Sequence, residues 1–406
     1  MTFFNKLKSN HEKTALVLSG GGSRGSYQIG VLKALNKISI KIDTVVGTSA
    51  GALNGAMIAM NKPDIAEDLW LSTRSEEIFN LNTDMPEMIE TLKKKLHIDS
   101  ELLGNLSLPP DQFVGYARDI INNGGVTVDG MDRLIKKYID EEKIRKSPME
   151  YGLVTVEYPS MTGYKLMKED IKEGLLCDYI KASASCFPFM QYSEILGKHY
   201  IDGGFTDNLP ISMALNREAK KIIAVDLGAI GKVHDKDIKL AKKTTDFYHI
   251  KSSFDLGNFL NFDPIQAKEN MDYGYLDTLK VFEKLDGLLY FFRKGSILIQ
   301  DIEKADAAAE IFQCPRKEIY TEKSLIERLK MPVLDSQVAL RKNSISNISI
   351  QNISNILNKP AIAVYIAENI LEKGNESHFY HSPLSEIFSK EILAAEFIIS
   401  RNLLND

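Results

Sequence analysis

The sequence predicts an α/β fold with a mainly parallel central sheet, because its N-terminal part holds two consecutive strand–turn–helix units. Residues 14–19 form a short apolar run that ends in the glycine-rich segment 20–25, after which apolar residues recur at helical spacing. Residues 42–46 form a second apolar run, followed by a glycine-containing turn at 47–51 and a helix of small residues over 52–60. Strands that alternate with helices in this way normally lie parallel, since each helix returns the chain to the same edge of the sheet.

The predicted first domain, residues 13–285, also contains an insertion and further strands. From about Pro63 to Pro148, helical stretches are interrupted by proline and glycine, so we expect a helical insertion over one edge of the sheet. Apolar runs further along the chain predict additional strands at 152–156, 164–167 and 221–225.

Residues 286–406 are predicted to form a mainly helical C-terminal extension, whose role the sequence does not indicate. Apolar residues at helical spacing from Leu384 to Ile399 predict one amphipathic helix. Isoleucines from Ile345 to Ile356 predict another, in a segment rich in asparagine and serine.

Charge and cysteine content exclude several classes of protein. Lysine and arginine total 50 against 55 aspartates and glutamates, and this net charge of −5 argues against a nucleic-acid-binding protein, which usually has a basic face. The spacing of Cys177, Cys186 and Cys314 indicates neither a disulfide framework nor a metal site. Residues 1–13 lack the apolar core of a signal peptide, and no segment reaches the roughly 18 apolar residues of a membrane span. We expect a cytoplasmic protein that meets a membrane, if at all, peripherally at its surface.

The pentapeptide Gly47–Gly51 fits the pattern G-x-S-x-G, with Ser49 at its centre. In hydrolases this pattern places a nucleophilic serine on a sharp turn between a strand and a helix, where the glycines avoid steric clashes. The alternative is a glycine-rich turn without chemistry. The position of the motif, between a predicted strand and a helix of small residues, favours a nucleophile.

The segment Gly20–Gly25 also joins a predicted strand to a predicted helix, and its sequence allows three interpretations. It fits the dinucleotide-binding pattern G-x-G-x-x-G, its successive N–H groups would suit an oxyanion hole, or the glycines could serve packing alone. A dinucleotide site needs an acidic residue at the C-terminal end of the second strand, but Asp43 lies at its start and Ser49 follows its end. This favours the oxyanion hole, in which the N–H groups of Gly21 and Gly22 face Ser49.

The best candidate for the base that activates Ser49 is an aspartate. None of the seven histidines occurs in a pattern typical of a catalytic turn, and Ser49 follows too few predicted strands for the usual α/β-hydrolase order. Asp202, by contrast, ends a short apolar stretch and precedes Gly203 and Gly204, which would let a substrate approach its carboxylate closely. The alternative is an ordinary Asp-Gly turn.

Three motifs taken together resemble those of the patatin-like phospholipases: the glycine-rich loop 20–25 with its basic residue, the elbow 47–51, and the Asp-Gly-Gly sequence at 202–204. They occur in the order that is typical of this family. The stretch 182–188 is also similar to its bacterial members. The resemblance covers residues 13–285, whereas the insertion and the C-terminal extension have no secure match.

This resemblance implies a three-layer αβα fold and a Ser-Asp dyad that needs no metal ion or organic cofactor. Ser49 would attack the ester carbonyl, and Asp202 would accept its proton. Arg24 would support the glycine-rich loop or place positive charge near a substrate phosphate. The oxyanion hole would consist of Gly20, Gly21 and Gly22. The supporting glycines would be Gly25, Gly47, Gly51, Gly203 and Gly204.

The predicted function is hydrolysis of carboxylic esters of lipids, such as phospholipids or lysophospholipids, through a covalent acyl-enzyme. Two alternatives are a soluble esterase or thioesterase that acts on non-membrane substrates, and a non-catalytic dinucleotide- or lipid-binding module. The sequence does not indicate the acyl position or the oligomeric state.

The predicted insertion carries a group of apolar side chains that would suit an acyl-chain cover. They run from Phe79 to Leu92 and include Met85 and Met88. Lys93–Lys95 follow them and would contact anionic headgroups. The alternative is that the apolar residues form ordinary core and that the lysines are solvated.

Overall fold

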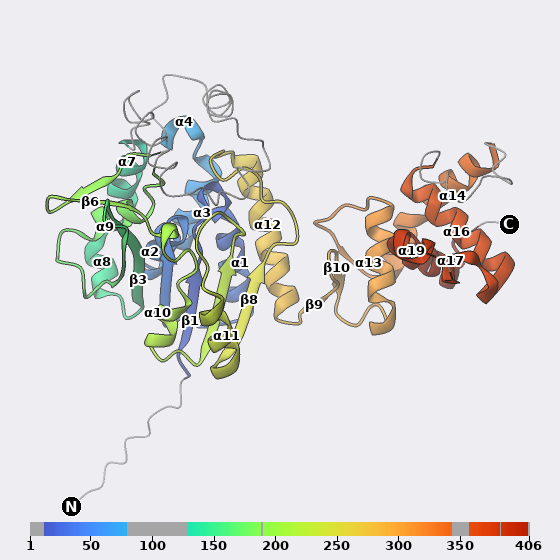
Figure 1. The fold of residues 1–406 in the computed structure, drawn as a ribbon, viewed down its shortest axis with the longest axis horizontal. Helices are drawn as coiled ribbons and strands as arrows, with labels where there is room; N and C mark the ends of the chain where they lie inside the picture. Colours follow the sequence, from blue (N-terminus) through green and yellow to red (C-terminus); the bar gives the residue numbers. More distant parts are fainter. Residues whose placement is uncertain (1–11, 79–128, 188–189, 343–356, 382, 405–406) are drawn as a thin grey trace, which may run out of the picture. The chain divides into compact units, whose positions relative to one another are not determined.

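The computed structural model of the chain describes residues 12–187, apart from 79–128, and residues 190–404, apart from 343–356 and 382 (Figure 1). It divides into two compact units, Met1–Thr278 and Leu279–Asp406. This boundary lies a few residues before the predicted one at 285/286.

The N-terminal unit is built on one sheet of eight described strands. The strand order is β5-β6-β3-β2-β1-β7-β8, and β4 pairs with β3 outside this path. The strands β3, β2, β1, β7 and β8 are parallel, whereas β4 and β6 run antiparallel to β3, and β5 runs antiparallel to β6. The mainly parallel sheet that the sequence predicts is therefore confirmed. The strands are β1 (Thr14–Leu18), β2 (Thr44–Thr48), β3 (Glu150–Tyr158), β4 (Thr162–Met167), β5 (Ser193–Ile195), β6 (Lys198–Asp202), β7 (Lys221–Asp226) and β8 (Asp246–Lys251).

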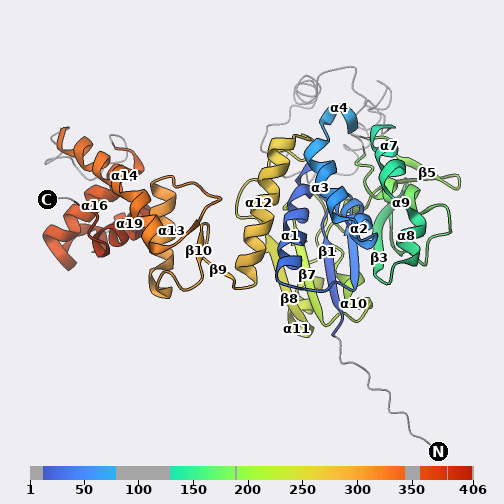
Figure 2. The same ribbon diagram turned by 180° about the vertical axis from the view of Figure 1, so that it is seen from behind.

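Helices cover both faces of this sheet and produce the three-layer αβα arrangement. The helices α10 (Ile211–Asn216) and α11 (Asp235–Thr244) lie on the face nearer the viewer in Figure 1. The helices α1 (Ser26–Lys37), α2 (Ala50–Ala59) and α12 (Pro264–Val281) lie on the other face, which is in front in Figure 2. Alternate residues of β1 point to opposite layers, and all are buried, because a central strand is covered on both sides.

The predicted insertion is described only at its two ends. Its first end forms α3 (Pro63–Ser72) and α4 (Ser75–Ile78), and its second forms α7 (Asp129–Tyr138) and α8 (Glu141–Lys146). The apolar group from Phe79 to Leu92 and the run Lys93–Lys95 lie outside the described residues, as do the predicted helix at 345–356 and Pro188. One further helix, α9 (Leu176–Ser183), lies between β4 and β5.

The C-terminal unit is mainly helical, but it also contains a small sheet that was not predicted from the sequence. The predicted single helix over 384–399 is wrong: α18 ends at Ile387 and α19 begins at Ser389. The break is at Phe388, whose backbone leaves the helical region at φ −108° and ψ 28° and whose ring packs edge-on against Phe379. The elements are β9 (Leu285–Asp286), β10 (Phe291–Arg293), α13 (Ile302–Ile311), β11 (Ile319–Tyr320), α14 (Glu322–Lys342), α16 (Lys359–Lys373), α17 (His378–His381), α18 (Leu384–Ile387) and α19 (Ser389–Ser400).

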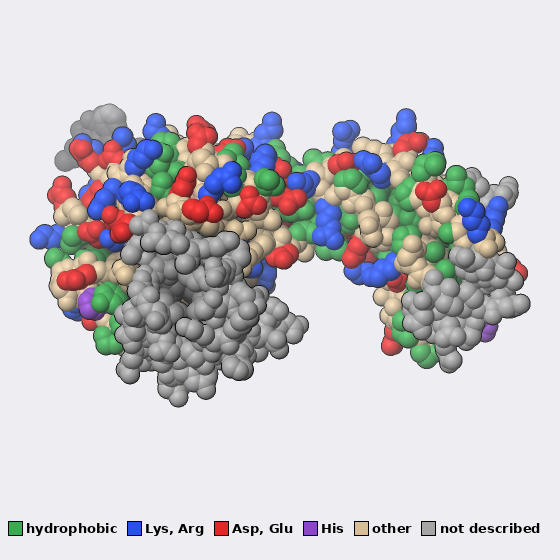
Figure 3. Space-filling model, turned by 90° about the horizontal axis from the view of Figure 1, so that it is seen from above, with side chains coloured by type: hydrophobic (Ala, Val, Ile, Leu, Met, Phe, Trp, Pro, Cys, Tyr) green, Lys and Arg blue, Asp and Glu red, His purple; other side chains and the backbone are tan. Residues whose placement is uncertain are grey.

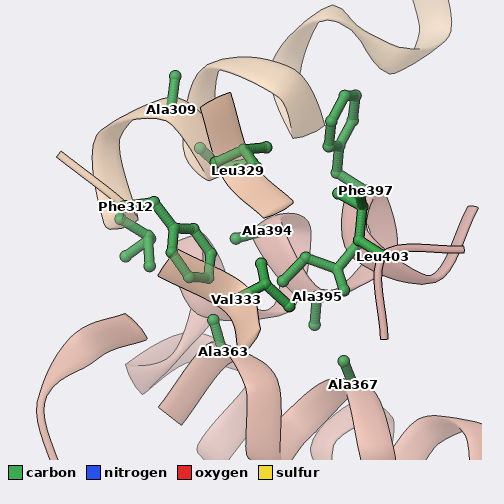
Figure 4. Packing of buried hydrophobic residues seen from close by; sticks show 14 of the residues in the cluster. Ala309, Phe312, Leu329, Val333, Ala363, Ala367, Ala394, Ala395, Phe397 and Leu403 are labelled. Carbon is green, nitrogen blue, oxygen red and sulfur yellow. The ribbon is translucent and has the colours of Figure 1, made fainter. Parts of the chain in front are cut away.

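The core of this second unit consists of alanines from three helices packed against larger apolar side chains. Figure 4 shows Leu329 and Val333 of α14 among alanines of α13, α16 and α19. Because alanine has a small side chain, the helix backbones can approach closely. On the face shown in Figure 3, acidic and basic side chains are interspersed over the described surface of both units. No helix among the described residues is long and apolar enough to cross a bilayer.

Candidate active site

Ser49 lies on the sharp turn between β2 and α2. Its backbone has φ 55° and ψ −123°, which is strained for a residue with a side chain. The turn is also crowded, because a Cβ atom on Gly47 would lie 2.3 Å from the carbonyl oxygen of Gly51. A Cβ atom on Gly51 would lie 2.3 Å from the oxygen of Leu18 on the neighbouring strand. Both positions therefore require glycine, and together they fix Ser49 at the carboxyl end of the sheet.

The hydroxyl of Ser49 faces the carboxylate of Asp202, the last residue of β6, and favours the ionised form of that carboxylate. Asp202 also accepts a hydrogen bond of 2.8 Å from the backbone N–H of Gly204. Asp202 is only 6% exposed, and this burial raises its pKa to about 6, although the Ser49 hydroxyl and the N–H of Gly204 act in the opposite direction. At neutral pH the carboxylate is mainly ionised and can accept a proton.

One short segment at the end of α9 holds both members of this pair. The backbone N–H of Ser49 donates to Oγ of Ser183 at 3.0 Å. Two residues later, the carbonyl oxygen of Ser185 accepts from the backbone N–H of Asp202 at 2.9 Å. The family resemblance includes this stretch, but no role for Ser183 was predicted from the sequence. Its contact with Ser49 spans 134 positions of the chain and so leaves no local pattern.

The glycine-rich loop, Gly20–Gly25, lies beside Ser49: a Cβ atom on Gly20 would be 3.0 Å from Cβ of Ser49. However, the N–H of Gly20 already donates to the carbonyl oxygen of Asn208 at 3.1 Å. Among the described residues, no group accepts from the N–H of Gly21 or Gly22. Two of the three predicted oxyanion donors therefore remain available, and Gly20 serves to fasten the loop. Gly22 has φ +55°, which favours glycine.

Arg24 fastens the other side of the same loop. Its Nε donates to the carbonyl oxygen of Gly257 at 2.8 Å, and its Nη1 donates to that of Gly228 at 3.1 Å. A longer contact of 3.5 Å joins Nη1 to the oxygen of Leu227. Of the two roles that the sequence allows for Arg24, this geometry favours support of the loop.

Asn208 connects the glycine-rich loop to the Asp-Gly-Gly turn. It is buried, its backbone oxygen accepts from Gly20, and its side-chain amide donates to the oxygen of Gly20 at 3.3 Å. Its own N–H donates to the backbone oxygen of Lys232 at 2.7 Å. In the turn itself, a Cβ atom on Gly203 would lie 2.3 Å from the oxygen of Val154 on β3. Asn208 was not among the site residues predicted from the sequence.

These groups border a largely apolar cavity of about 700 Å³. Ser49, Asp202 and the glycine loop form its polar end. The ends of the predicted insertion form part of its apolar wall: α3, α4 and α7 contribute Leu69, Trp70, Ile78, Met131, Leu134 and Ile135. The segments 158–161, 184–187 and 259–262, together with Met190, add further aromatic and methionine side chains. Among the described residues that line the cavity, Asp202 and Lys232 are the charged ones.

A chain of hydrogen bonds links the cavity wall to the glycine-rich loop. The indole N–H of Trp70 donates to Oδ1 of Asn54 at 2.9 Å. The amide of Asn54 donates to the oxygen of Gly25 at 2.9 Å and to Oε1 of Gln28 at 2.8 Å. Gln28 in turn donates to the oxygen of Ser19 at 2.8 Å. All of these groups belong to elements that surround Ser49, so the network couples the shape of the cavity to the loop.

No histidine occurs among the described residues that line this cavity. His234 contacts the carbonyl oxygen of Thr206 at 2.8 Å, and His249 contacts the carboxylate of Asp226 at 3.4 Å. His11 and His97 lie outside the described residues. Within the described part of the chain, no group of three or more acidic, histidine or cysteine side chains is arranged to hold a metal ion.

The comparison with protein families agrees with this geometry. Residues 16–215 match the model of the patatin-like phospholipase family. These residues belong to the patatin-like phospholipase family. The match begins in β1 and ends in α10, so the patatin-like region contains the glycine-rich loop, Ser49 and Asp202.

Curated relatives share this patatin-like region. Lysophospholipase NTE1 of Meyerozyma guilliermondii is 28% identical over 226 residues, which are 54% of this chain and 13% of that protein. Patatin-like phospholipase domain-containing protein 6 of Homo sapiens is 28% identical over 218 residues, which are 53% of this chain and 13% of that protein. The matched region thus spans about an eighth of the length of these relatives.

Solved structures give only a weak overall likeness. VipD from Legionella pneumophila has 13% identity and a TM-score of 0.35, with 97% of this chain and 90% of that chain covered. The type III effector ExoU has 13% identity and a TM-score of 0.31, with 96% and 80% covered. At these scores the likeness supports no conclusion about function.

Proposed function

We propose that this protein hydrolyses carboxylic esters of long-chain lipids, with Ser49 as nucleophile and Asp202 as general base. The observation that carries this proposal is the placement of the Ser49 hydroxyl beside a buried carboxylate, that of Asp202, at the polar end of an apolar cavity. The patatin-like region and relatives that are named as lysophospholipase and phospholipase support it.

The chemistry follows from the positions of these groups. Asp202 accepts the proton as Oγ of Ser49 attacks the ester carbonyl carbon, and the carbonyl oxygen becomes an oxyanion. The N–H groups of Gly21 and Gly22, which no described residue engages, stabilise this charge in the transition state and the tetrahedral intermediate. Protonated Asp202 then gives its proton to the departing alcohol, and an acyl-enzyme is left. Water, deprotonated by Asp202, releases the fatty acid and restores Ser49.

The apolar wall of the cavity provides the site for the acyl chain. Its lining along α2 includes Leu53 and Met57, and α3 and α7 extend the same surface with Trp70 and Ile135. A fatty-acyl chain that contacts these side chains leaves water, which favours binding by about 0.8 kcal/mol for each buried CH₂ group. Short-chain esters gain less, so chain length is expected to matter for kcat/KM.

Labelling with a fluorophosphonate tests the nucleophile directly. Such a probe phosphonylates an activated serine, so we expect the wild-type protein to be labelled and Ser49→Ala to remain unlabelled. A parallel assay with long-chain and acetyl esters of the same alcohol tests the acyl site, and we expect the long chain to be preferred. Labelling of Ser49→Ala to the same extent as wild type would contradict the assignment. Equal hydrolysis of both chain lengths would instead favour a general esterase.

A further inference from the structure

A phospholipid carries a phosphate beyond its ester, and a cation at the cavity would recognise that phosphate. Arg24 does not provide it, because it does not line the cavity and its Nε and Nη1 donate to the backbone oxygens of Gly257 and Gly228. Those contacts hold a structural loop, and a substrate phosphate would have to displace them. A free cation at the cavity must therefore come from another element.

Lys232 is the basic residue among the described residues that line the cavity. It is exposed, and none of the described carboxylates forms an ion pair with its ammonium group. Because none of the described carboxylates neutralises this ammonium group, it can attract an anion.

The backbone of Lys232 is fixed to the proposed catalytic turn. Its N–H donates to the oxygen of Gly204 at 2.8 Å, and its oxygen accepts from Asn208 at 2.7 Å. Gly204 in turn donates to the carboxylate of Asp202 at 2.8 Å. Two successive hydrogen bonds therefore connect the backbone of Lys232 to the proposed base, although the two residues are far apart in sequence.

We propose that Lys232 binds the phosphate of a glycerophospholipid substrate and is the residue that makes the enzyme prefer an anionic headgroup over a neutral one. This rests on the proposed function, since it assigns a specificity role at the same site. The glycerol backbone places the phosphate only a few bonds from the ester that Ser49 attacks. A residue that is anchored beside Asp202 and carries a flexible side chain is suited to reach it.

The test compares two substrates that differ only in the phosphate. One is 1-octanoyl lysophosphatidic acid, and the other is 1-octanoylglycerol, both below their critical micelle concentrations so that no lipid surface contributes. The measured quantity is the ratio of kcat/KM for the phosphate-bearing substrate to kcat/KM for the neutral one. Lys232→Met should lower this ratio roughly tenfold, mainly through KM, because a hydrogen bond to a charged group is lost. Lys232→Arg should keep most of the ratio.

Lys236→Met is the matched control, since Lys236 lies in the first turn of α11 and does not line the cavity. It should leave the ratio unchanged. An unchanged ratio in Lys232→Met, or an equal fall with both lysine variants, would overturn the proposal. Binding of the phosphate-bearing lipid to Ser49→Ala, measured by calorimetry with and without Lys232→Met, tests the same contact without hydrolysis. Absence of hydrolysis in the wild type, with binding that depends on Lys232, would refute the proposed function and the substrate preference that rests on it, whereas the contact of Lys232 with the phosphate would stand.

Discussion

The two units of the molecule each bury an aspartate, and the two carboxylates are used in different ways. In the N-terminal unit, Asp202 accepts one backbone N–H and faces the hydroxyl of Ser49 at the edge of a cavity. In the C-terminal unit, Asp306 of α13 accepts from three consecutive backbone N–H groups, those of Leu288, Leu289 and Tyr290. Burial raises the pKa of both groups.

The two carboxylates differ in whether an oxygen is left over once the backbone N–H groups have been bound. Asp306 uses both oxygens to hold a loop, so a change in its charge would disrupt that loop. Asp202 faces the hydroxyl of Ser49 where both residues line the cavity, and in the proposed mechanism it takes up and releases a proton there. A raised pKa alone therefore does not mark a base, since burial also raises the pKa of Asp306; we expect a base to combine it with a cavity and a neighbouring nucleophile.

The largest expected effect is the loss of turnover when Ser49, in the N-terminal unit, is replaced. Ser49→Ala should lower kcat by several orders of magnitude, about 10⁶-fold in a comparable nucleophile deletion. The change removes one oxygen and should leave the fold intact, which circular dichroism and thermal unfolding would check. Turnover close to that of the wild type on an accepted ester would remove Ser49 from the mechanism.

Asp202→Asn should lower kcat by about 10⁴-fold, as for other residues that assist a nucleophilic serine. The same variant should be more stable than the wild type at pH 8, by about 1–3 kcal/mol. The folded pKa of Asp202 is raised, so its contribution to stability is present below about pH 4 and is lost as the pH rises through about 6. Chemical denaturation at pH 8 and pH 4 checks this, and the gain should vanish at pH 4. A variant that is less stable at pH 8 would show that the carboxylate is structural, like Asp306.

The pH dependence gives the next largest effect. With Asp202 as base, kcat/KM for a neutral ester should be constant above pH 7 and fall about tenfold per pH unit below pH 6, as the carboxylate becomes protonated. Rates measured from pH 4.5 to 8.5 determine the controlling pKa. A profile that stays flat down to pH 4.5 would exclude this base.

Asp306→Asn should lower the free energy of unfolding, whereas Asp202→Asn should raise it at pH 8. An amide cannot accept from all three N–H groups, so at least one is left unpaired, at a cost of about 2 kcal/mol in the free energy of unfolding. Ester hydrolysis should continue, because Asp306 belongs to the other unit. Thermal unfolding and a standard esterase assay measure the two effects separately. Loss of activity without loss of stability would show that the C-terminal unit acts on the site.

The smallest effect is spectroscopic. Trp70 is the single tryptophan of the chain and lines the cavity, so its fluorescence should change when an acyl chain occupies the apolar wall. Addition of a long-chain fatty acid to Ser49→Ala should shift the emission, whereas acetate should not. An emission that is unchanged at saturating fatty acid would place the acyl site elsewhere.

The sequence predicts best those parts of the fold that depend on continuous apolar runs. The strands β1 and β7 are buried on both faces, and their positions agree with the predicted ones. The edge strand β8 was missed because only one of its six residues is fully buried, so it lacks an apolar run. The break at Phe388 was also missed, since apolar spacing continues across it and the non-helical backbone of Phe388 leaves no signal in the local sequence.

Some parts of the candidate site could likewise be predicted from the sequence, and others could not. Ser49, Asp202 and the glycines are visible because turns restrict which residues fit, and the structure brings them together. The supporting contacts could not be predicted from the sequence, because they join residues that are far apart in it. Ser183 contacts Ser49 across 134 positions, and Asn208 contacts Gly20 across 188. The position of Gly20 in the loop is set in the same way, since a distant carbonyl oxygen takes its N–H.

The single side chain of Asn54 has a consequence for any attempt to redesign chain-length selectivity. Its amide oxygen accepts from Trp70 and its amide nitrogen donates to Gly25, so one residue serves both the acyl wall and the glycine-rich loop. Enlarging the cavity by Trp70→Leu would strip the oxygen of its donor inside a buried region. A wider substrate range then comes with a loosened loop and slower turnover, unless the new residue also supplies an N–H at that point. Histidine or glutamine at position 70 offers such a donor in a smaller side chain, and libraries at this position are best built around those two.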